Sequence, residues 1–176
     1  MAAGLVVLVG LDRSGSPSSG DLPPTSRDDV VLSVEADRAH GGVELSFTVA
    51  VADDSDATLR LIDWSPGGGA DLLAAAHGDR PDTGPVVLHL GLGSIVGGGH
   101  VDYMEPPVPE ERRVEPGEAI EGRATFDPVT ALALPEHRPI RAADLERADG
   151  IRVCLWDATA DPDGGGDPVA CADDDL

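Results

Sequence analysis

The stretch Val43-Glu44-Leu45-Ser46-Phe47-Thr48-Val49-Ala50-Val51 decides the fold class of this chain. Every second residue along it is apolar and bulky, whereas the residues between them are polar or small. Successive side chains of a β-strand point to opposite faces, so this period of two predicts a strand with one face in a hydrophobic core.

Similar short apolar runs recur along the chain, separated by turns rich in glycine, aspartate and proline. The strand at 43–51 and the next one are expected to form a hairpin, and Ala142–Ala148 is expected to form a short helix that ends at Gly150. A second short helix is expected at 70–77. We predict an all-β fold, an antiparallel β-sandwich of about seven or eight strands with one or two short helices in loops. The other expected strands are 30–36, 58–64, 85–92, 100–104, 119–126, 151–156 and 168–172.

The turn Val114-Glu115-Pro116-Gly117-Glu118 and the alternating strand after it resemble a segment common in microbial immunoglobulin-like domains. In those domains a proline-glycine turn opens a strand late in the sandwich, and the 43–51 strand resembles their core strand. The resemblance implies an immunoglobulin-like sandwich and, because many functions share that fold, it implies no function. The chain departs from antibody-type domains because no cysteine precedes Trp64, so their inter-sheet disulfide is absent.

The length of 176 residues predicts one domain, which we place at 27–176. Residues 1–26 form an apolar tip followed by a flexible linker rich in serine, glycine and proline. The tip is too short to span a bilayer and lacks the basic region of a signal peptide. It is typical of the end of an export signal or membrane anchor that starts upstream. The alternatives are a first strand of the sandwich and the sticky end of a cytoplasmic protein.

The charge of the chain is strongly negative, with 33 acidic residues against 12 basic ones and a net charge of -21. Such a field repels nucleic acid and anionic membrane surfaces, and it attracts cations and basic partners. Adaptation to high salt or the codon bias of a GC-rich genome explains the same composition without a partner. All the basic residues are arginine, and lysine, asparagine and glutamine are absent. Schiff-base and P-loop lysine chemistry are therefore excluded, as is a Cys–His–Asn triad.

Two further patterns are partly similar to enzyme signatures. The glycines Gly91, Gly93 and Gly97 follow a strand, but their spacing is one residue longer than a dinucleotide fingerprint and no helix is expected after them. His100 and Asp102 would share one face of a strand, yet the chain has no Gly-x-Ser-x-Gly elbow to supply a nucleophile. We therefore expect no catalytic residues, no cofactor and no enzyme activity.

Three carboxylates in the glycine-rich loop after residue 160, Asp161, Asp163 and Asp167, form a candidate calcium site. Asp157 and Asp173 would add oxygen ligands if the flanking strands formed a hairpin. The alternative is a solvated acidic turn. A second, weaker candidate for calcium consists of Asp53, Asp54 and Asp56.

Cys154 and Cys171 are the two cysteines of the chain. They would pair in an exported protein, whereas in a cytosolic one they would be small buried apolar residues. A separate candidate is a binding surface in the proline-rich loop that contains Tyr103, Met104, Pro106 and Pro107. The alternative for this loop is a rigid connection between strands.

The function that these observations favour is a non-enzymatic, extracytoplasmic or membrane-anchored module that binds a ligand or serves a structural role. Two alternatives stay open. One is a cytoplasmic acidic protein that acts as an accessory subunit or inhibitor of a basic partner. The other is an extracellular domain stabilised by calcium.

Overall fold

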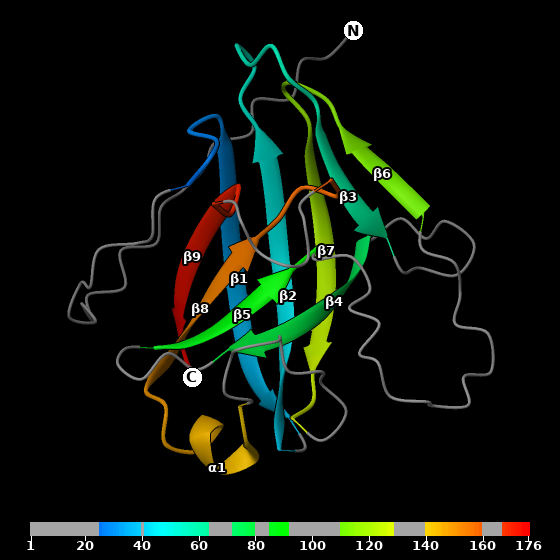
Figure 1. Ribbon diagram of the computed structural model, residues 1–176. Helices are drawn as coiled ribbons and strands as arrows, with labels where there is room; N and C mark the ends of the chain where they lie inside the picture. Colours follow the sequence, from blue (N-terminus) through cyan, green and yellow to red (C-terminus); the bar gives the residue numbers. More distant parts are fainter. Residues whose placement is uncertain are drawn as a thin grey trace, which may run out of the picture.

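The computed structural model describes residues 25–39, 41–63, 72–79, 85–91, 110–128, 140–159 and 167–176 (Figure 1). This part of the chain consists mainly of strands with a single turn of helix, so the all-β prediction is confirmed. Its elements are β1 (Val30–Ala39), β2 (Gly42–Val51), β3 (Leu59–Asp63), β4 (Leu72–Asp79), β5 (Val86–Leu90), β6 (Glu110–Val114), β7 (Ala119–Phe126), α1 (Ala142–Leu145), β8 (Gly150–Leu155) and β9 (Ala170–Asp175).

Seven of these strands form one sheet in the order β1-β2-β7-β4-β5-β8-β9, and β3 pairs with β6 in a separate sheet. Most neighbours are antiparallel, but β4 is parallel to β7 and β5 is parallel to β8. The expectation of a purely antiparallel arrangement is therefore wrong. The members of each parallel pair are not consecutive in the chain, and only consecutive strands can be joined by a tight hairpin that makes them antiparallel.

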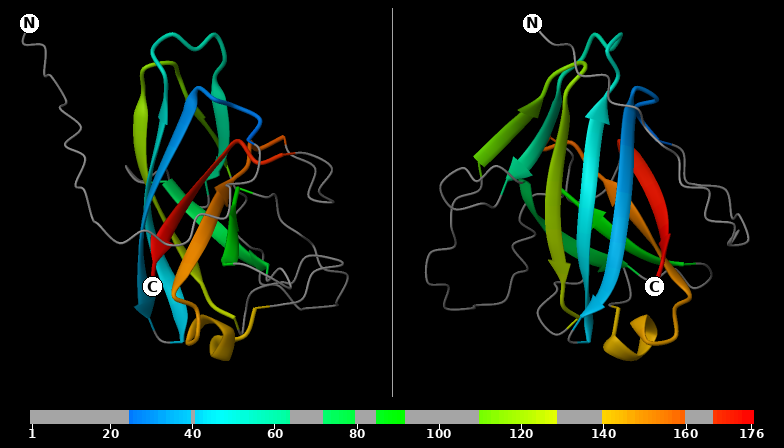
Figure 2. Two further views of the ribbon diagram at one scale, coloured as in Figure 1. Left: turned by 90° about the vertical axis from the view of Figure 1, so that its left-hand side faces the viewer. Right: turned by 180° about the vertical axis from the view of Figure 1, so that it is seen from behind.

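The large sheet turns a corner at β4. The first half of β4, Leu72–Ala75, pairs with β7, and the second half, Ala76–Asp79, pairs with β5. A strand that changes partners in this way bends one part of a sheet over another. Seen from behind, β7, β2, β1 and β9 stand side by side while β4 and β5 cross behind them (Figure 2, right). The two edge strands, β1 and β9, lie against each other, and the Ala36 N–H donates a hydrogen bond to Asp174 Oδ2 at 2.8 Å.

The curled sheet encloses one core of buried apolar side chains that runs from β1 to β9 and includes Leu145 of α1. Along β2 the side chains of Leu45, Phe47 and Val49 are buried and those between them are exposed, as the alternation predicted. The β3–β6 sheet adds Leu59, Leu61 and Val114 to the same core. Fully burying one such side chain stabilises the fold by about 1.5–3 kcal/mol.

Three local expectations are wrong. The described part of the helix expected at 70–77 belongs instead to the strand β4, Leu72–Asp79, because pairing with β7 and β5 overrides the helical propensity of a Leu- and Ala-rich segment. The expected hairpin between 43–51 and 58–64 is absent, since β2 pairs with β1 and β7, whereas β3 pairs with β6. The strand β6 was not expected, because its sequence Glu-Glu-Arg-Arg-Val buries only Val114 and has no apolar alternation.

The turn predicted at 114–118 joins β6 to β7. Gly117 has a φ of 79°, and the Glu118 N–H donates to the Glu115 carbonyl at 2.9 Å. Pro116 and Gly117 thus occupy the two central positions of a type II turn, where proline fixes the first φ and glycine tolerates the positive second one. The strand at 119–126, the helical turn at 142–145 and the final pair of strands are also confirmed. The strand expected at 100–104 lies outside the described residues.

Candidate binding site

The outer face of the β1–β2–β7 layer carries a groove. Apolar residues of these strands point into the core, so the residues between them form rows across the outer face. The register places Ser33, Thr48 and Glu121 in one row. The next row contains Glu35, Ser46 and Arg123. All six side chains are exposed.

The groove has a volume of about 420 Å³ and follows these two rows. It is hollow because Ser46 and Thr48 of the central strand β2 are short, whereas Glu35 on β1 and Glu121 and Arg123 on β7 are long. Beneath it, a Cβ atom on Gly122 would lie 2.3 Å from Cζ of Phe47. Glycine at this position therefore lets the buried phenyl ring pack directly on the β7 backbone, which supports the floor of the groove.

The rows on either side of the groove differ in character. Beyond Glu35 lies a row of Asp37, Glu44 and Thr125, and beyond Ser33 lies a row of Val31, Ala50 and Ala119. Val31 is 60% exposed, and among the described residues it is the one large hydrophobic side chain that is exposed. The outer face thus changes from acidic to apolar along β2, from Glu44 to Ala50. We call these four rows the β1–β2–β7 face.

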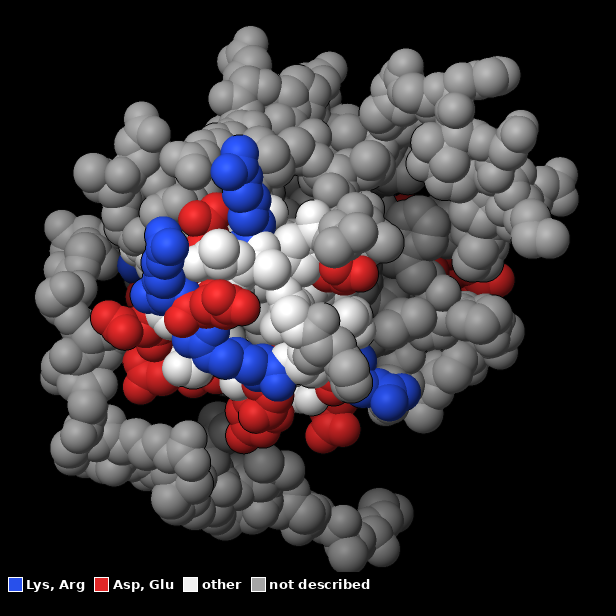
Figure 3. All heavy atoms as spheres, turned by 90° about the horizontal axis from the view of Figure 1, so that it is seen from below, with Lys and Arg blue, Asp and Glu red and all other residues white. Residues whose placement is uncertain are grey.

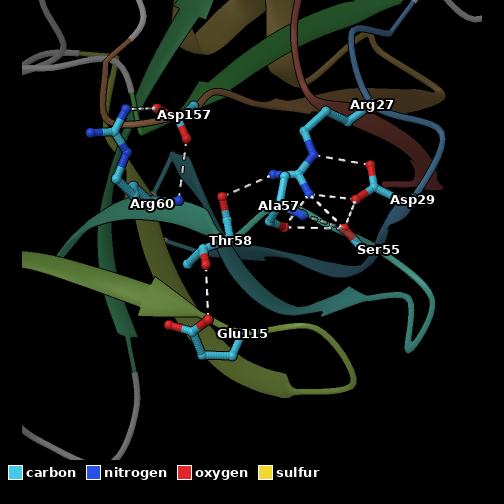
Figure 4. Close-up of polar contacts among 8 residues, drawn as sticks. All are labelled: Arg27, Asp29, Ser55, Ala57, Thr58, Arg60, Glu115 and Asp157. Atoms are coloured by element: carbon cyan, nitrogen blue, oxygen red, sulfur yellow. Dashed lines mark hydrogen bonds and ion pairs between the residues drawn. The ribbon is translucent and has the colours of Figure 1, made fainter.

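A second polar cluster holds the segment before β1 to the loop between β2 and β3 (Figure 4). The Arg27 guanidinium donates to both carboxylate oxygens of Asp29, to the Ser55 hydroxyl and to the carbonyls of Ala57 and Thr58. Hydrogen bonds from Arg27 and then from Ser55 hold the pKa of Asp29 well below its ordinary value. The bond to Asp29 also raises the pKa of Arg27. We call these residues the Arg27 cluster.

The same end of the molecule joins β3 to the segment after β8. The Arg60 N–H donates to Asp157 Oδ2 at 3.2 Å, and the Ala158 N–H donates to the Arg60 carbonyl at 2.7 Å. Burial by itself raises the pKa of Asp157. Hydrogen bonds from Thr159 and from the Arg60 N–H lower the pKa by more than burial raises it, so the net shift is downward. Asp157 therefore acts as a connector between the two sheets.

Other arginines also connect segments that are distant in sequence. Arg38 donates to the carbonyls of Leu145 and Ala148 at the end of α1. Arg152 of β8 forms a bidentate ion pair with Asp173 of β9, at 2.7 and 2.9 Å, which raises the pKa of Arg152. Seen from the α1 end, basic and acidic side chains are interleaved rather than separated into fields of one sign (Figure 3).

Cys154 and Cys171 face each other across β8 and β9 and are joined by a disulfide. The disulfide predicted for an exported chain is therefore present in the structure. His89 is the neighbour of Cys154 on β5, and its Nδ1 accepts a hydrogen bond from Trp156 Nε1 at 3.2 Å.

The structure does not assemble the expected calcium site from the residues that it describes. Asp167 is exposed, and Asp161 and Asp163 lie outside the described residues. The flanking strands form the hairpin that was expected, but Asp157 bonds to Arg60 and Thr159 while Asp173 pairs with Arg152. Within the described ranges, no group of three or more histidine, cysteine or acidic residues is placed to hold a metal ion, and this includes the carboxylates at 53–56.

The other candidates from the sequence also fall outside the described part of the chain. They are the surface of Tyr103, Met104, Pro106 and Pro107 and the pair of His100 and Asp102. Sequence reasoning missed the groove. The available signal was the run of Glu44, Ser46 and Thr48 between the core residues of the 43–51 strand, which marks a polar outer face with short side chains.

Comparison of the chain with protein-family models, curated proteins and solved structures found no match. Among the described residues, no helix is long and apolar enough to cross a membrane.

Proposed function

We propose that this chain is a non-enzymatic binding module that works outside the cytoplasm and holds its ligand on the β1–β2–β7 face. The observation that carries the proposal is the groove of about 420 Å³ along β2. It lies on a layer of three paired strands backed by buried core residues, and sites on such rigid elements are well suited to recognition.

The chemistry of the groove supports binding rather than catalysis. Its lining offers the hydroxyls of Ser33, Ser46 and Thr48, two carboxylates and one guanidinium. Among the described residues that line it, there is no histidine or cysteine. A serine or threonine hydroxyl becomes a nucleophile only beside a general base such as histidine. The same groups act well as hydrogen-bond donors and acceptors for a polar ligand.

The disulfide between Cys154 and Cys171 supports an extracytoplasmic location. Disulfides form and persist in oxidising compartments and are rare in the cytosol. Both cysteines of the chain are used in this one bond, which joins adjacent strands of the core sheet.

An immunoglobulin-like relationship is part of this proposal. Two features support it: the Pro116-Gly117 turn that opens β7, and the central position of β2 in its layer. The parallel pairs β4–β7 and β5–β8 are departures from an antiparallel sandwich of that type.

The location is tested by counting free thiols in the full chain recovered from its native cells under denaturing conditions without reductant. We expect none, and we expect a Cys154→Ala/Cys171→Ala variant to lose about 3 kcal/mol of unfolding free energy, since the bond closes a loop of 17 residues. Two free thiols in the native protein would contradict an extracytoplasmic role.

The binding role is tested on an array that contains neutral glycans, basic peptides and acidic peptides. We expect the full chain to bind one class and Ser46→Trp, which fills the groove, to lose that binding. Ala143→Trp adds the same side chain at an exposed position of α1, away from the groove, and serves as the control. If no class distinguishes the wild type from Ser46→Trp while both melt cooperatively, the proposal fails.

A further inference from the structure

The carboxylates of the β1–β2–β7 face differ from three aspartates elsewhere in the described structure that arginines hold. Arginine side chains pair with Asp29, Asp157 and Asp173. The ion pairs found among the described residues include none with Glu35, Glu44 or Glu121. Four acidic residues and one arginine stand on this face, so it is negative before any ligand arrives; they are Glu35, Asp37, Glu44, Glu121 and Arg123.

The sign of this charge selects the occupant. A face with excess negative charge attracts a cationic ligand and repels nucleic acid or a phosphorylated one, and a neutral sugar gains nothing from the excess. The net charge of -21 for the whole chain adds a long-range attraction of the same sign. The exposed apolar row at Val31 favours a ligand that also carries an apolar group at one end, where it would contact this row.

The geometry of the face matches an extended peptide. Residues of one face of a strand repeat every second position, about 6.6 Å apart, and an extended peptide presents its own side chains with the same spacing. A peptide lying along β2 therefore places alternate side chains over successive rows. The short side chains of Ser46 and Thr48 leave room for its backbone, while Glu35 on β1 and Glu121 on β7 form the two sides.

We propose that the β1–β2–β7 face binds an extended basic peptide segment of a partner protein along β2, with a small apolar residue over Val31 and Ala50 and basic residues at alternate positions beside Glu121, Glu35 and Glu44. This inference rests on the proposed function, because it names the ligand of the same groove. The proposal specifically requires basic residues at alternate positions of the peptide, because a continuous block of basic residues would not match the spacing of the rows on the face.

The test uses the full chain and fluorescent peptides measured by anisotropy. One peptide carries valine followed by arginine at every second position, a second has the same composition with its arginines in one block, and a third has glutamates in place of arginines. We expect the alternating peptide to bind about tenfold more tightly than the block peptide, the glutamate peptide not to bind, and affinity to fall when NaCl is raised from about 0.05 to 0.5 M.

Variants locate the site. Glu35→Gln/Glu44→Gln should weaken binding of the alternating peptide about tenfold. Glu110→Gln/Asp175→Asn removes the same charge from exposed positions outside the face and should leave binding within about twofold. Both double variants keep side-chain size, so each is expected to fold, and a thermal melt checks this.

The outcomes separate the inference from the function on which it rests. Equal weakening by both double variants, or equal binding of the alternating and block peptides, overturns the inference because attraction would then be general. Binding of a glycan that Ser46→Trp abolishes also overturns the inference while leaving the binding role intact. Absence of any ligand sensitive to Ser46→Trp overturns both.

Discussion

The Arg27 cluster and the β1–β2–β7 face contain the same kind of acidic side chain in opposite surroundings. In the cluster, Asp29 accepts hydrogen bonds from a guanidinium and a hydroxyl, and its pKa is lowered. On the face, the carboxylates of Glu35, Glu44 and Glu121 are exposed and take part in none of the ion pairs found among the described residues.

The difference shows where the chain uses its few arginines. With 12 basic residues for 33 acidic ones, carboxylates outnumber the cationic side chains that could pair with them. Arg27, Arg38 and Arg60 each connect segments that are distant in sequence, and each is placed at a junction between a strand and a loop or helix. Fold stability should therefore depend more on the paired carboxylates than on those without an ion pair among the described residues.

The largest effect is expected from Arg27→Ala. This change removes the donors for Asp29, Ala57 and Thr58 in a side chain that is only 17% exposed, so we expect a loss of about 2–3 kcal/mol in unfolding free energy. Urea denaturation gives the value. Arg113→Ala is the matched control, because Arg113 is 69% exposed beside Glu111 and should change stability by less than about 0.5 kcal/mol. Equal effects of the two substitutions would contradict the idea that Arg27 supports the fold more than an exposed arginine does.

The pH dependence of Asp29 should have an intermediate effect. A carboxylate whose pKa is lowered by folding stabilises the protein fully above its unfolded pKa, near 3.8, and this stabilisation is lost as the pH falls through the lower folded value. At pH 6 we expect Asp29→Asn to be less stable than the wild type by about 1–2 kcal/mol, with the gap closing below pH 3.8. Denaturation midpoints from pH 6 to pH 2 measure it, and a gap that does not change with pH contradicts the assignment.

The smallest effect is expected on the face itself. Glu35→Gln/Glu44→Gln removes two exposed charges that have no ion pair among the described residues, so stability should stay within about 0.5 kcal/mol or rise slightly as repulsion falls. Thermal melts of the variant and the wild type at low salt provide the measurement. A clear loss of stability would mean that these carboxylates support the fold, and the contrast with Arg27 would fail.

The sequence predicted strand positions better than strand neighbours. The alternation around Phe47 and Phe126 identified β2 and β7, because period and burial are local properties. The pairing of β2 with β7, which is distant in the sequence, depends on which edges remain free once the core forms, and no local pattern encodes that choice. β4 shows the same limit, since its Leu- and Ala-rich sequence favours a helix, whereas its first half pairs with β7 and its second half with β5.

The candidate site shows a similar division. The disulfide could be anticipated because two cysteines allow one pairing, and β8 and β9 bring them face to face. The groove could not be anticipated, because Ser33, Ser46 and Glu121 become neighbours only through the register of three strands. The Arg27 cluster was also invisible, since its acceptors include the backbone carbonyls of Ala57 and Thr58, which every residue possesses.

The meeting of β1 and β9 has a mechanical consequence. The pairings from β1 through to β9 make these two edge strands run in the same direction, β1 from the top of the view and β9 toward the C-terminus at the bottom (Figure 1). Tension applied between the start of β1 and the end of β9 slides the two strands past each other along their length. Contacts such as the one between Ala36 and Asp174 then carry the load together instead of opening one at a time. The disulfide passes part of that load from β9 to β8, so a pulled domain should resist extension through its unfolding barrier rather than through its equilibrium stability.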